Sequence, residues 1–134
     1  MVYGVGVRIL IAEDERINQL YLSLVLSSAG HEVQVACDGE RVLGCLTERS
    51  YDLIVMDMQM PQVDGFEAAR RIRAGEAGPE RARVPIVAIS AYATRDDAAR
   101  YAEAGIDRFA MKPVTEDRLL SIIEDLGLTD EGNA

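Results

Sequence analysis

The sequence predicts an α/β fold in which helices cover both faces of a parallel sheet of five strands. Five short apolar runs alternate along the chain with five segments whose apolar residues recur at helical spacing. Strands that alternate with helices favour a parallel sheet with both faces buried. Turn and cap residues separate the segments, and a length of 134 residues suits one domain.

Each expected strand is a β-rich apolar run, and each is followed by a helix-like segment. The strands are expected at residues 7–12, 33–36, 52–56, 85–90 and 107–111. The helices are expected from Ile17 to Gly30, over residues 40–48, from Asp64 to about Ala74, from Thr94 through Ala104, and from Thr115 to Gly127. Right-handed crossovers leave few topologies, and we expect the flavodoxin-like (βα)₅ three-layer sandwich with strand order 2-1-3-4-5.

Charge and composition narrow the function classes. The net charge of −9 opposes binding to nucleic acid and to anionic membranes. The chain has no apolar stretch of 18 residues and its start lacks the layout of a signal peptide, so a cytoplasmic protein is expected. We expect one domain with a core of about residues 8–127 and tails at 1–6 and 128–134. His31, the single histidine, is expected to be a solvated turn residue.

Polar residues stand where four of the expected strands end. They are Glu13 and Asp14 after the first strand, Asp57 after the third, Ser90 on the fourth and Lys112 after the fifth. Because the carboxyl ends of parallel strands meet at one edge of the sheet, these groups are expected to converge. Three neighbouring carboxylates repel one another unless a cation lies among them or some are protonated. Mg²⁺ prefers such oxygen ligands, with Mn²⁺ as the alternative; the competing interpretation is a set of separate acids that cap helices.

The choice of basic residues singles out one position. Thirteen of the fourteen are arginine, and Lys112 is the one lysine. A compact ammonium and a planar guanidinium are not interchangeable where a single small cation must fit. Lys112 is therefore a candidate for a specific role at the predicted site.

Four sequence runs together resemble the receiver domains of two-component signalling. They are ILIAEDERINQ, DLIVMDMQMPQVDGFE, PIVAISA and DRFAMKP, in this order and at these spacings. The resemblance covers about residues 8–127. It implies that Asp57, which precedes x-x-M-P, accepts a phosphoryl group from a phosphohistidine and forms an acyl phosphate.

The resemblance also implies a ligand set for Mg²⁺. Asp14 would bind the metal directly, together with Asp57, and Glu13 would bind it through a water. The third protein ligand would be the backbone carbonyl of Gln59 rather than its side chain. The metal would neutralise charge on the phosphoryl group during transfer.

The remaining family positions concern the phosphoryl oxygens and a conformational switch. The resemblance implies that Lys112 pairs with a phosphoryl oxygen, or with Asp57 before transfer, and that the Lys112–Pro113 bond is cis. Ser90, where threonine is commoner, would hydrogen-bond another phosphoryl oxygen. In the switch, Ser90 moves toward the phosphoryl group and Phe109 turns inward; the competing interpretation makes Phe109 an ordinary apolar residue.

Two positions flank the path of a water that would hydrolyse the acyl phosphate. They are Gln59 and Tyr92, and we hypothesise that the bulk of Tyr92 slows dephosphorylation. Tyr92 could equally be an ordinary surface aromatic. If it shields the acyl phosphate, Tyr92→Ala loses its phosphoryl group faster than the wild type; equal or slower loss would refute the hypothesis.

Three functions compete on sequence grounds. The first is a phosphoacceptor domain that catalyses its own phosphorylation, and the second is a pseudo-receiver that binds partners without phosphorylation. The third is a phosphatase of the haloacid-dehalogenase type, which would need a second aspartate where Gln59 stands. The complete set of acids with Ser90 and Lys112 favours the first.

The partners are expected to be a histidine kinase, a histidine phosphotransfer domain, or both. The runs EDERINQ and SAYA resemble receivers attached to hybrid histidine kinases more than stand-alone regulators. The family's surface for passing on the signal lies on the fourth helix, fifth strand and fifth helix.

Overall fold

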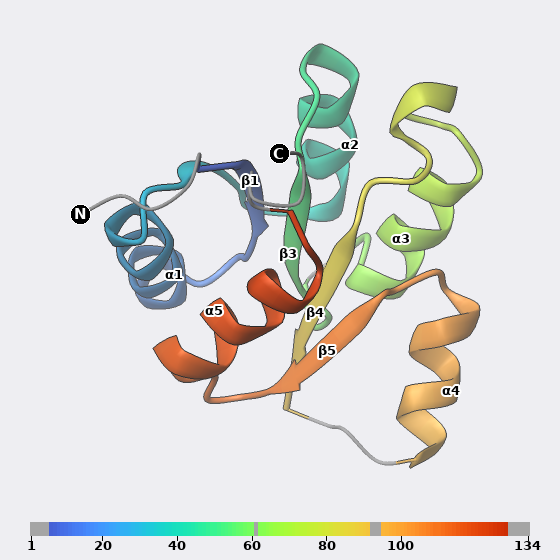
Figure 1. Ribbon diagram of the computed structural model, residues 1–134. Helices are drawn as coiled ribbons and strands as arrows, with labels where there is room; N and C mark the ends of the chain where they lie inside the picture. Colours follow the sequence, from blue (N-terminus) through green and yellow to red (C-terminus); the bar gives the residue numbers. More distant parts are fainter. Residues whose placement is uncertain (1–5, 61, 92–94, 129–134) are drawn as a thin grey trace.

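A single sheet of five parallel strands forms the centre of the molecule (Figure 1). The computed structural model describes residues 6–60, 62–91 and 95–128. The strands lie in the order β2-β1-β3-β4-β5, which confirms the predicted topology. Their bounds are β1 Arg8–Ala12, β2 Glu32–Ala36, β3 Leu53–Asp57, β4 Ile86–Ser90 and β5 Arg108–Met111.

Five α-helices connect and cover the strands, two on one face and three on the other (Figure 1). Helices α1 (Arg16–Ser28) and α5 (Glu116–Asp125) share one face. The opposite face carries α2 (Gly39–Glu48), α3 (Gly65–Arg73) and α4 (Arg95–Glu103). A short 3-10 helix at Pro79–Arg81 lies between α3 and β4, where no regular element was expected.

The sheet separates two hydrophobic cores. Alternate residues of each strand point to opposite faces, so Leu10 and Ile54 join the core under α2, α3 and α4. Their neighbours Ile9 and Leu53 join the core under α1 and α5. Strands β3 and β4 are buried at every position, which explains why their sequences are continuous apolar runs rather than alternating ones.

Helix ends follow the predicted local chemistry where the structure describes them. The side chains of Asp64 and Thr115 accept hydrogen bonds from backbone N–H groups three residues on, which fixes the starts of α3 and α5. Gly30 and Gly105 adopt positive φ angles of 96° and 87° just after α1 and α4. The predicted cap at Thr94 lies outside the described residues.

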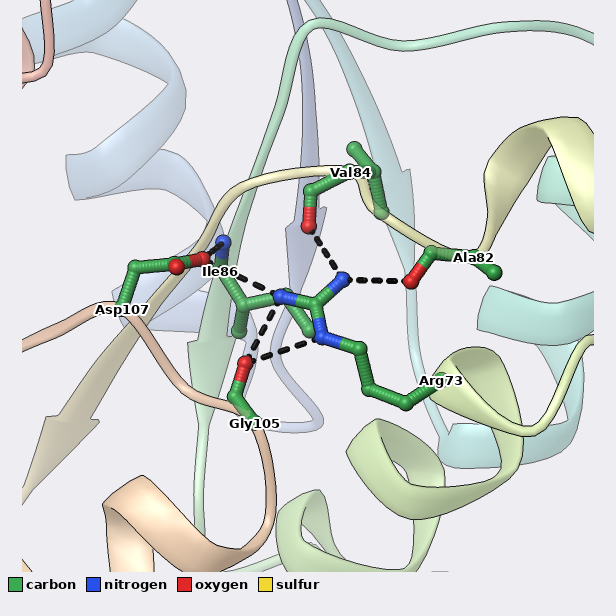
Figure 2. Close-up of polar contacts among 6 residues, drawn as sticks. All are labelled: Arg73, Ala82, Val84, Ile86, Gly105 and Asp107. Atoms are coloured by element: carbon green, nitrogen blue, oxygen red, sulfur yellow. Dashed lines mark hydrogen bonds and ion pairs between the residues drawn. The ribbon is translucent and has the colours of Figure 1, made fainter.

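At the edge where the strands begin, Arg73 of α3 ties several loops together (Figure 2). Its Nε and Nη2 donate to the carbonyl of Gly105, and its Nη1 donates to the carbonyls of Ala82 and Val84. Nη2 also contacts the carboxylate of Asp107 at 3.1 Å. These contacts engage all five N–H groups of the guanidinium, a set that a lysine could not make.

Side chains at this same edge also accept hydrogen bonds from backbone N–H groups at or just before the start of a strand. The donor–acceptor pairs are Val7 with His31, Arg8 with Asp52 and Ile86 with Asp107. His31 is half-buried and accepts at Nδ1, so the expectation of a solvated turn residue was wrong. Desolvation by burial lowers the pKa of His31.

No helix among residues 6–60, 62–91 and 95–128 has both the length and the apolar character to cross a membrane.

Candidate functional site

Three carboxylates converge where β1 and β3 end. Glu13 and Asp14 directly follow β1, and Asp57 is the last residue of β3. The two strands pair in register from Ile9 with Leu53, which brings their ends to one level of the sheet. One oxygen from each carboxylate lies within 4.8 Å of the others.

Two of these acids are removed from water. Glu13 is 1% exposed and Asp57 is 3% exposed, whereas Asp14 is open to solvent. The pKa of Glu13 is raised to about 7, mainly because the carboxyl is buried and partly because of the nearby charge of Asp57, while the hydrogen bond from the Glu15 N–H acts in the opposite direction. The cluster therefore carries a charge repulsion that a cation would relieve.

The one lysine of the chain lies against this cluster. The Lys112 Nζ is 3.1 Å from Oδ1 of Asp57, and the backbone N–H of Gln59 donates to the same oxygen at 3.0 Å. The backbone N–H of Lys112 donates to the carbonyl of Ser90 at 2.7 Å, which ties the lysine to the end of β4. The Lys112–Pro113 bond is cis, as the resemblance implied.

The other predicted positions differ in their burial and in their distance from the acidic cluster. Ser90 is 2% exposed at the end of β4, beside β5, while the side chain of Gln59 is exposed. Tyr92 lies outside the described residues. Phe109 is half-buried and belongs to the core below α4 rather than to the acidic cluster.

Phe109 is the end member of a column of three aromatic rings. The ring centroid of Phe109 lies 5.0 Å from that of Tyr101 on α4, and Tyr101 stacks at 5.3 Å on Phe66 of α3. The guanidinium of Arg100 lies 4.3 Å from the centroid of Phe66, within cation–π distance. Phe109 thus contacts Tyr101 of α4, and Tyr101 in turn contacts Phe66 of α3.

The donor set fits a small hard cation. All three clustered side chains offer carboxylate oxygens, which suit Mg²⁺ better than a metal that prefers nitrogen or sulfur. The site also contains a buried acid, Glu13, whose pKa is raised mainly by burial. The residues present therefore fit the metal implied by the family.

Sequence reasoning missed two supporting residues on α1. The side-chain amide of Gln19 donates to the carbonyl of Glu13 at 2.7 Å, and the hydroxyl of Tyr21 donates to the carbonyl of Val114 at 2.8 Å. Helix α1 also leaves several large apolar residues exposed, namely Ile17 (73%), Leu20 (56%), Tyr21 (40%) and Leu24 (67%). The helix is apolar on two faces, and periodicity alone could not tell which face is covered.

Comparisons with known proteins agree with this geometry. The family model of the response regulator receiver domain matches residues 9–124. The hybrid signal transduction histidine kinase I of Dictyostelium discoideum is 35% identical over 87% of this chain, and the virulence sensor protein BvgS of Bordetella pertussis is 37% identical over 86%. The chain spans only 7% and 10% of the lengths of these two relatives.

A solved structure extends the agreement to the metal. The receiver domain of the sensor histidine kinase PA1611 of Pseudomonas aeruginosa is 33% identical, with a TM-score of 0.81 over 90% of this chain and 97% of that one. Its crystal structure has a magnesium ion coordinated in the active-site cleft. The chain belongs to the response regulator receiver domain family. More particularly, it is homologous to the receiver domains of hybrid sensor kinases.

Proposed function

We propose that this domain accepts a phosphoryl group on Asp57 in a histidine-to-aspartate phosphorelay. The observation that carries the proposal is the contact at 3.1 Å between the Lys112 ammonium and the buried Asp57 carboxylate, beside two further acids. An ammonium beside an acidic cluster provides a fixed positive partner for the oxygens of an incoming phosphoryl group. The pseudo-receiver alternative is disfavoured because it would leave this complete set of groups without a use.

In the proposed transfer, a carboxylate oxygen of Asp57 attacks the phosphorus of a phosphohistidine. A phosphorus–oxygen bond forms, the phosphorus–nitrogen bond breaks, and its electron pair remains on the imidazole nitrogen. Lys112 and the hydroxyl of Ser90 stabilise the phosphoryl oxygens. Burial of Asp57 limits the access of water to the acyl phosphate that results.

Asp14 and Asp57 would hold Mg²⁺, or Mn²⁺ in its place, with the carbonyl of Gln59 as a further ligand and with Glu13 bound through a water. When bound, the metal supplies positive charge beside the phosphoryl oxygens. Gln19 fixes the Glu13 carbonyl and so steadies the segment that provides two of the acids. Removal of the metal with EDTA is expected to stop phosphorylation by any donor.

The partner is proposed to be a histidine kinase or a histidine phosphotransfer domain in the cytoplasm, as the hybrid-kinase relatives suggest. The exposed apolar residues of α1 would offer this partner a docking surface, and two of them, Ile17 and Tyr21, line a groove together with Lys112. Leu24→Ala should then slow transfer from a phosphotransfer domain and leave phosphorylation by a small donor unchanged. Equal rates with the protein donor would remove α1 from the interface.

The response to phosphorylation is proposed to run through Ser90 and Phe109. The aromatic column of Phe66, Tyr101 and Phe109 supports this assignment, because it links β5 to α3 and α4. Movement of Phe109 would alter the surface of α4, β5 and α5, which is proposed to pass on the signal.

The test of the acceptor uses phosphoramidate, a small donor with the same phosphorus–nitrogen bond as phosphohistidine. With Mg²⁺, the intact wild-type protein should gain the mass of one phosphoryl group, and Asp57→Asn should gain none. Asp64→Asn is the matched control, because asparagine caps a helix about as well as aspartate does. No adduct on the wild type would support the pseudo-receiver, and rapid turnover of phosphomonoesters would support a phosphatase.

A further inference from the structure

Tyr21 joins helix α1 to the segment that carries the active-site lysine. Its hydroxyl donates to the carbonyl of Val114 at 2.8 Å, across 93 positions of sequence. Val114 lies two residues after Lys112, between the end of β5 and the Thr115 cap of α5. The Tyr21 ring lines a groove of about 700 Å³ whose walls also include Glu13 and Lys112.

The short connection between β5 and α5 is held from two sides. On one side, the backbone N–H of Lys112 donates to the carbonyl of Ser90 in β4 at 2.7 Å. On the other side, Tyr21 of α1 holds the Val114 carbonyl. The lysine thus leaves the backbone from a point fixed between a strand and a helix.

This fixation matters because the lysine side chain is long and flexible. Four rotatable bonds separate the ammonium from its backbone, and the position of the backbone decides which of their rotamers bring Nζ to Asp57. The contact at 3.1 Å therefore depends on the position of the β5–α5 connection. One hydrogen bond of ordinary strength can bias that position without deciding whether the protein folds.

We propose that Tyr21 is a positioning residue for phosphoryl transfer. Its hydroxyl fixes Val114, and the fixed connection keeps the Lys112 ammonium within reach of Asp57. The inference rests on the proposed role of Asp57 as acceptor, and it adds a residue outside the acidic cluster to the machinery of transfer. Tyrosine is needed because neither phenylalanine nor an aliphatic residue could donate to the Val114 carbonyl.

The first experiment removes only the hydroxyl. Tyr21→Phe should lower the maximal rate of Asp57 phosphorylation by phosphoramidate about fivefold at saturating Mg²⁺, which is the effect of one typical hydrogen bond. The phosphoramidate concentration for half-maximal rate should stay the same, because Tyr21 does not contact the donor. An unchanged maximal rate would overturn the proposal.

A matched control is available at the other edge of the sheet. Tyr51 is buried just before β3, and its hydroxyl lies near the thiol of Cys45. Tyr51→Phe removes a tyrosine hydroxyl of comparable kind and should lower stability with no change in the phosphorylation rate. An equal loss of rate in both variants would indicate a general structural effect and refute the proposal.

A double-mutant cycle tests whether Tyr21 acts through the lysine. If it does, Tyr21→Phe should have no further effect on the rate in a Lys112→Met background. If the tyrosine change lowers the rate by the same factor in both backgrounds, Tyr21 does not work through Lys112. Where the Lys112→Met rate is too low to measure, the lysine signal described next decides.

The single lysine permits a direct observation that needs no phosphorylation. Protein labelled with ¹⁵N-lysine gives one side-chain ammonium signal, from Lys112. Tyr21→Phe should shift or broaden this signal, and Tyr51→Phe should leave it in place. An unchanged signal in Tyr21→Phe would overturn the positioning role, whereas a shifted signal in a protein that accepts no phosphoryl group would refute only the proposed function.

Discussion

The two edges of the sheet differ in how their polar and charged side chains are paired. Where the strands begin, Arg73 engages all five of its N–H groups, and three side chains accept hydrogen bonds from backbone N–H groups at or just before the strand starts. Where the strands end, buried Glu13 and Asp57 lie within 4.8 Å of each other and share a single nearby ammonium. At the first edge these groups are paired by hydrogen bonds, and the second edge keeps like charges together.

This difference indicates how stability and reactivity are divided. The hydrogen bonds at the first edge lower the free energy of the folded state. An edge with unrelieved charge raises that free energy but binds a cation and an electrophilic phosphorus more readily. Substitutions at the two edges should therefore change the free energy of unfolding in opposite directions.

The largest effect is expected from Arg73→Met. Four backbone and side-chain acceptors lose their donor, so the free energy of unfolding should fall by about 3 kcal/mol or more. Arg73→Lys should recover only part of the loss, because one ammonium cannot reach all the acceptors. Urea denaturation measures both values.

The control for Arg73 lies on the same helix. Arg70 is 57% exposed and pairs with Glu67 at 3.8 Å, so Arg70→Met should change stability by no more than about 0.5 kcal/mol. If the two methionine variants were equally stable, the hydrogen bonds of Arg73 would contribute nothing to the free energy of unfolding.

A smaller effect of opposite sign is expected from Glu13→Gln. Without divalent metal at pH 8, the free energy of unfolding should rise by about 2 kcal/mol, because glutamine keeps the shape and removes a buried charge. Between the ordinary pKa of 4.5 and the folded value of about 7, the folded state holds a proton that the unfolded state has lost. Wild-type stability therefore falls as the pH rises through this window, and the variant should lack that fall.

The same variant should bind Mg²⁺ more weakly, since it loses one carboxylate of the cluster. Titration of the thermal midpoint with MgCl₂ would show a smaller rise for Glu13→Gln than for the wild type. If Glu13→Gln were less stable than the wild type in EDTA at pH 8, the charge of Glu13 would not destabilise the folded protein.

The smallest effect concerns His31 at the first edge. Burial lowers the pKa of His31, so near pH 6 the unfolded state binds the proton more readily than the folded state does. The contribution of His31 is complete above the ordinary pKa of 6.5 and declines as the pH falls toward the lower folded value. His31→Ala should cost about 1 kcal/mol at pH 8 and less at pH 5, as measured by urea denaturation. A cost independent of pH would show that folding does not change the pKa of His31.

The second edge could be predicted from the sequence more fully than the first. Parallel strands bring their carboxyl ends together, so the order of the elements was enough to gather Glu13, Asp14 and Asp57. Lys112 stood out because it is the one lysine. Arg73 did not, because it is one of thirteen arginines and its partners are backbone carbonyls that carry no sequence signature.

Helix α1 shows a second limit of prediction from the sequence, which concerns the face of a helix that is buried. Its apolar residues repeat at helical spacing around two faces, and only the face with Leu22, Val25 and Leu26 is buried. The sequence indicated a helix without indicating which face meets the sheet. The bond from Tyr21 to Val114 depends on the tertiary distance between α1 and the β5–α5 connection, which local patterns do not encode.

The aromatic column has a consequence for how the domain can be observed. The chain has no tryptophan, so its intrinsic ultraviolet emission comes from tyrosine. Tyr101 is held between Phe66 and Phe109, and a rotation of the Phe109 ring would change the surroundings of this buried fluorophore. Because of that packing, the protein contains its own optical reporter of the state of β5.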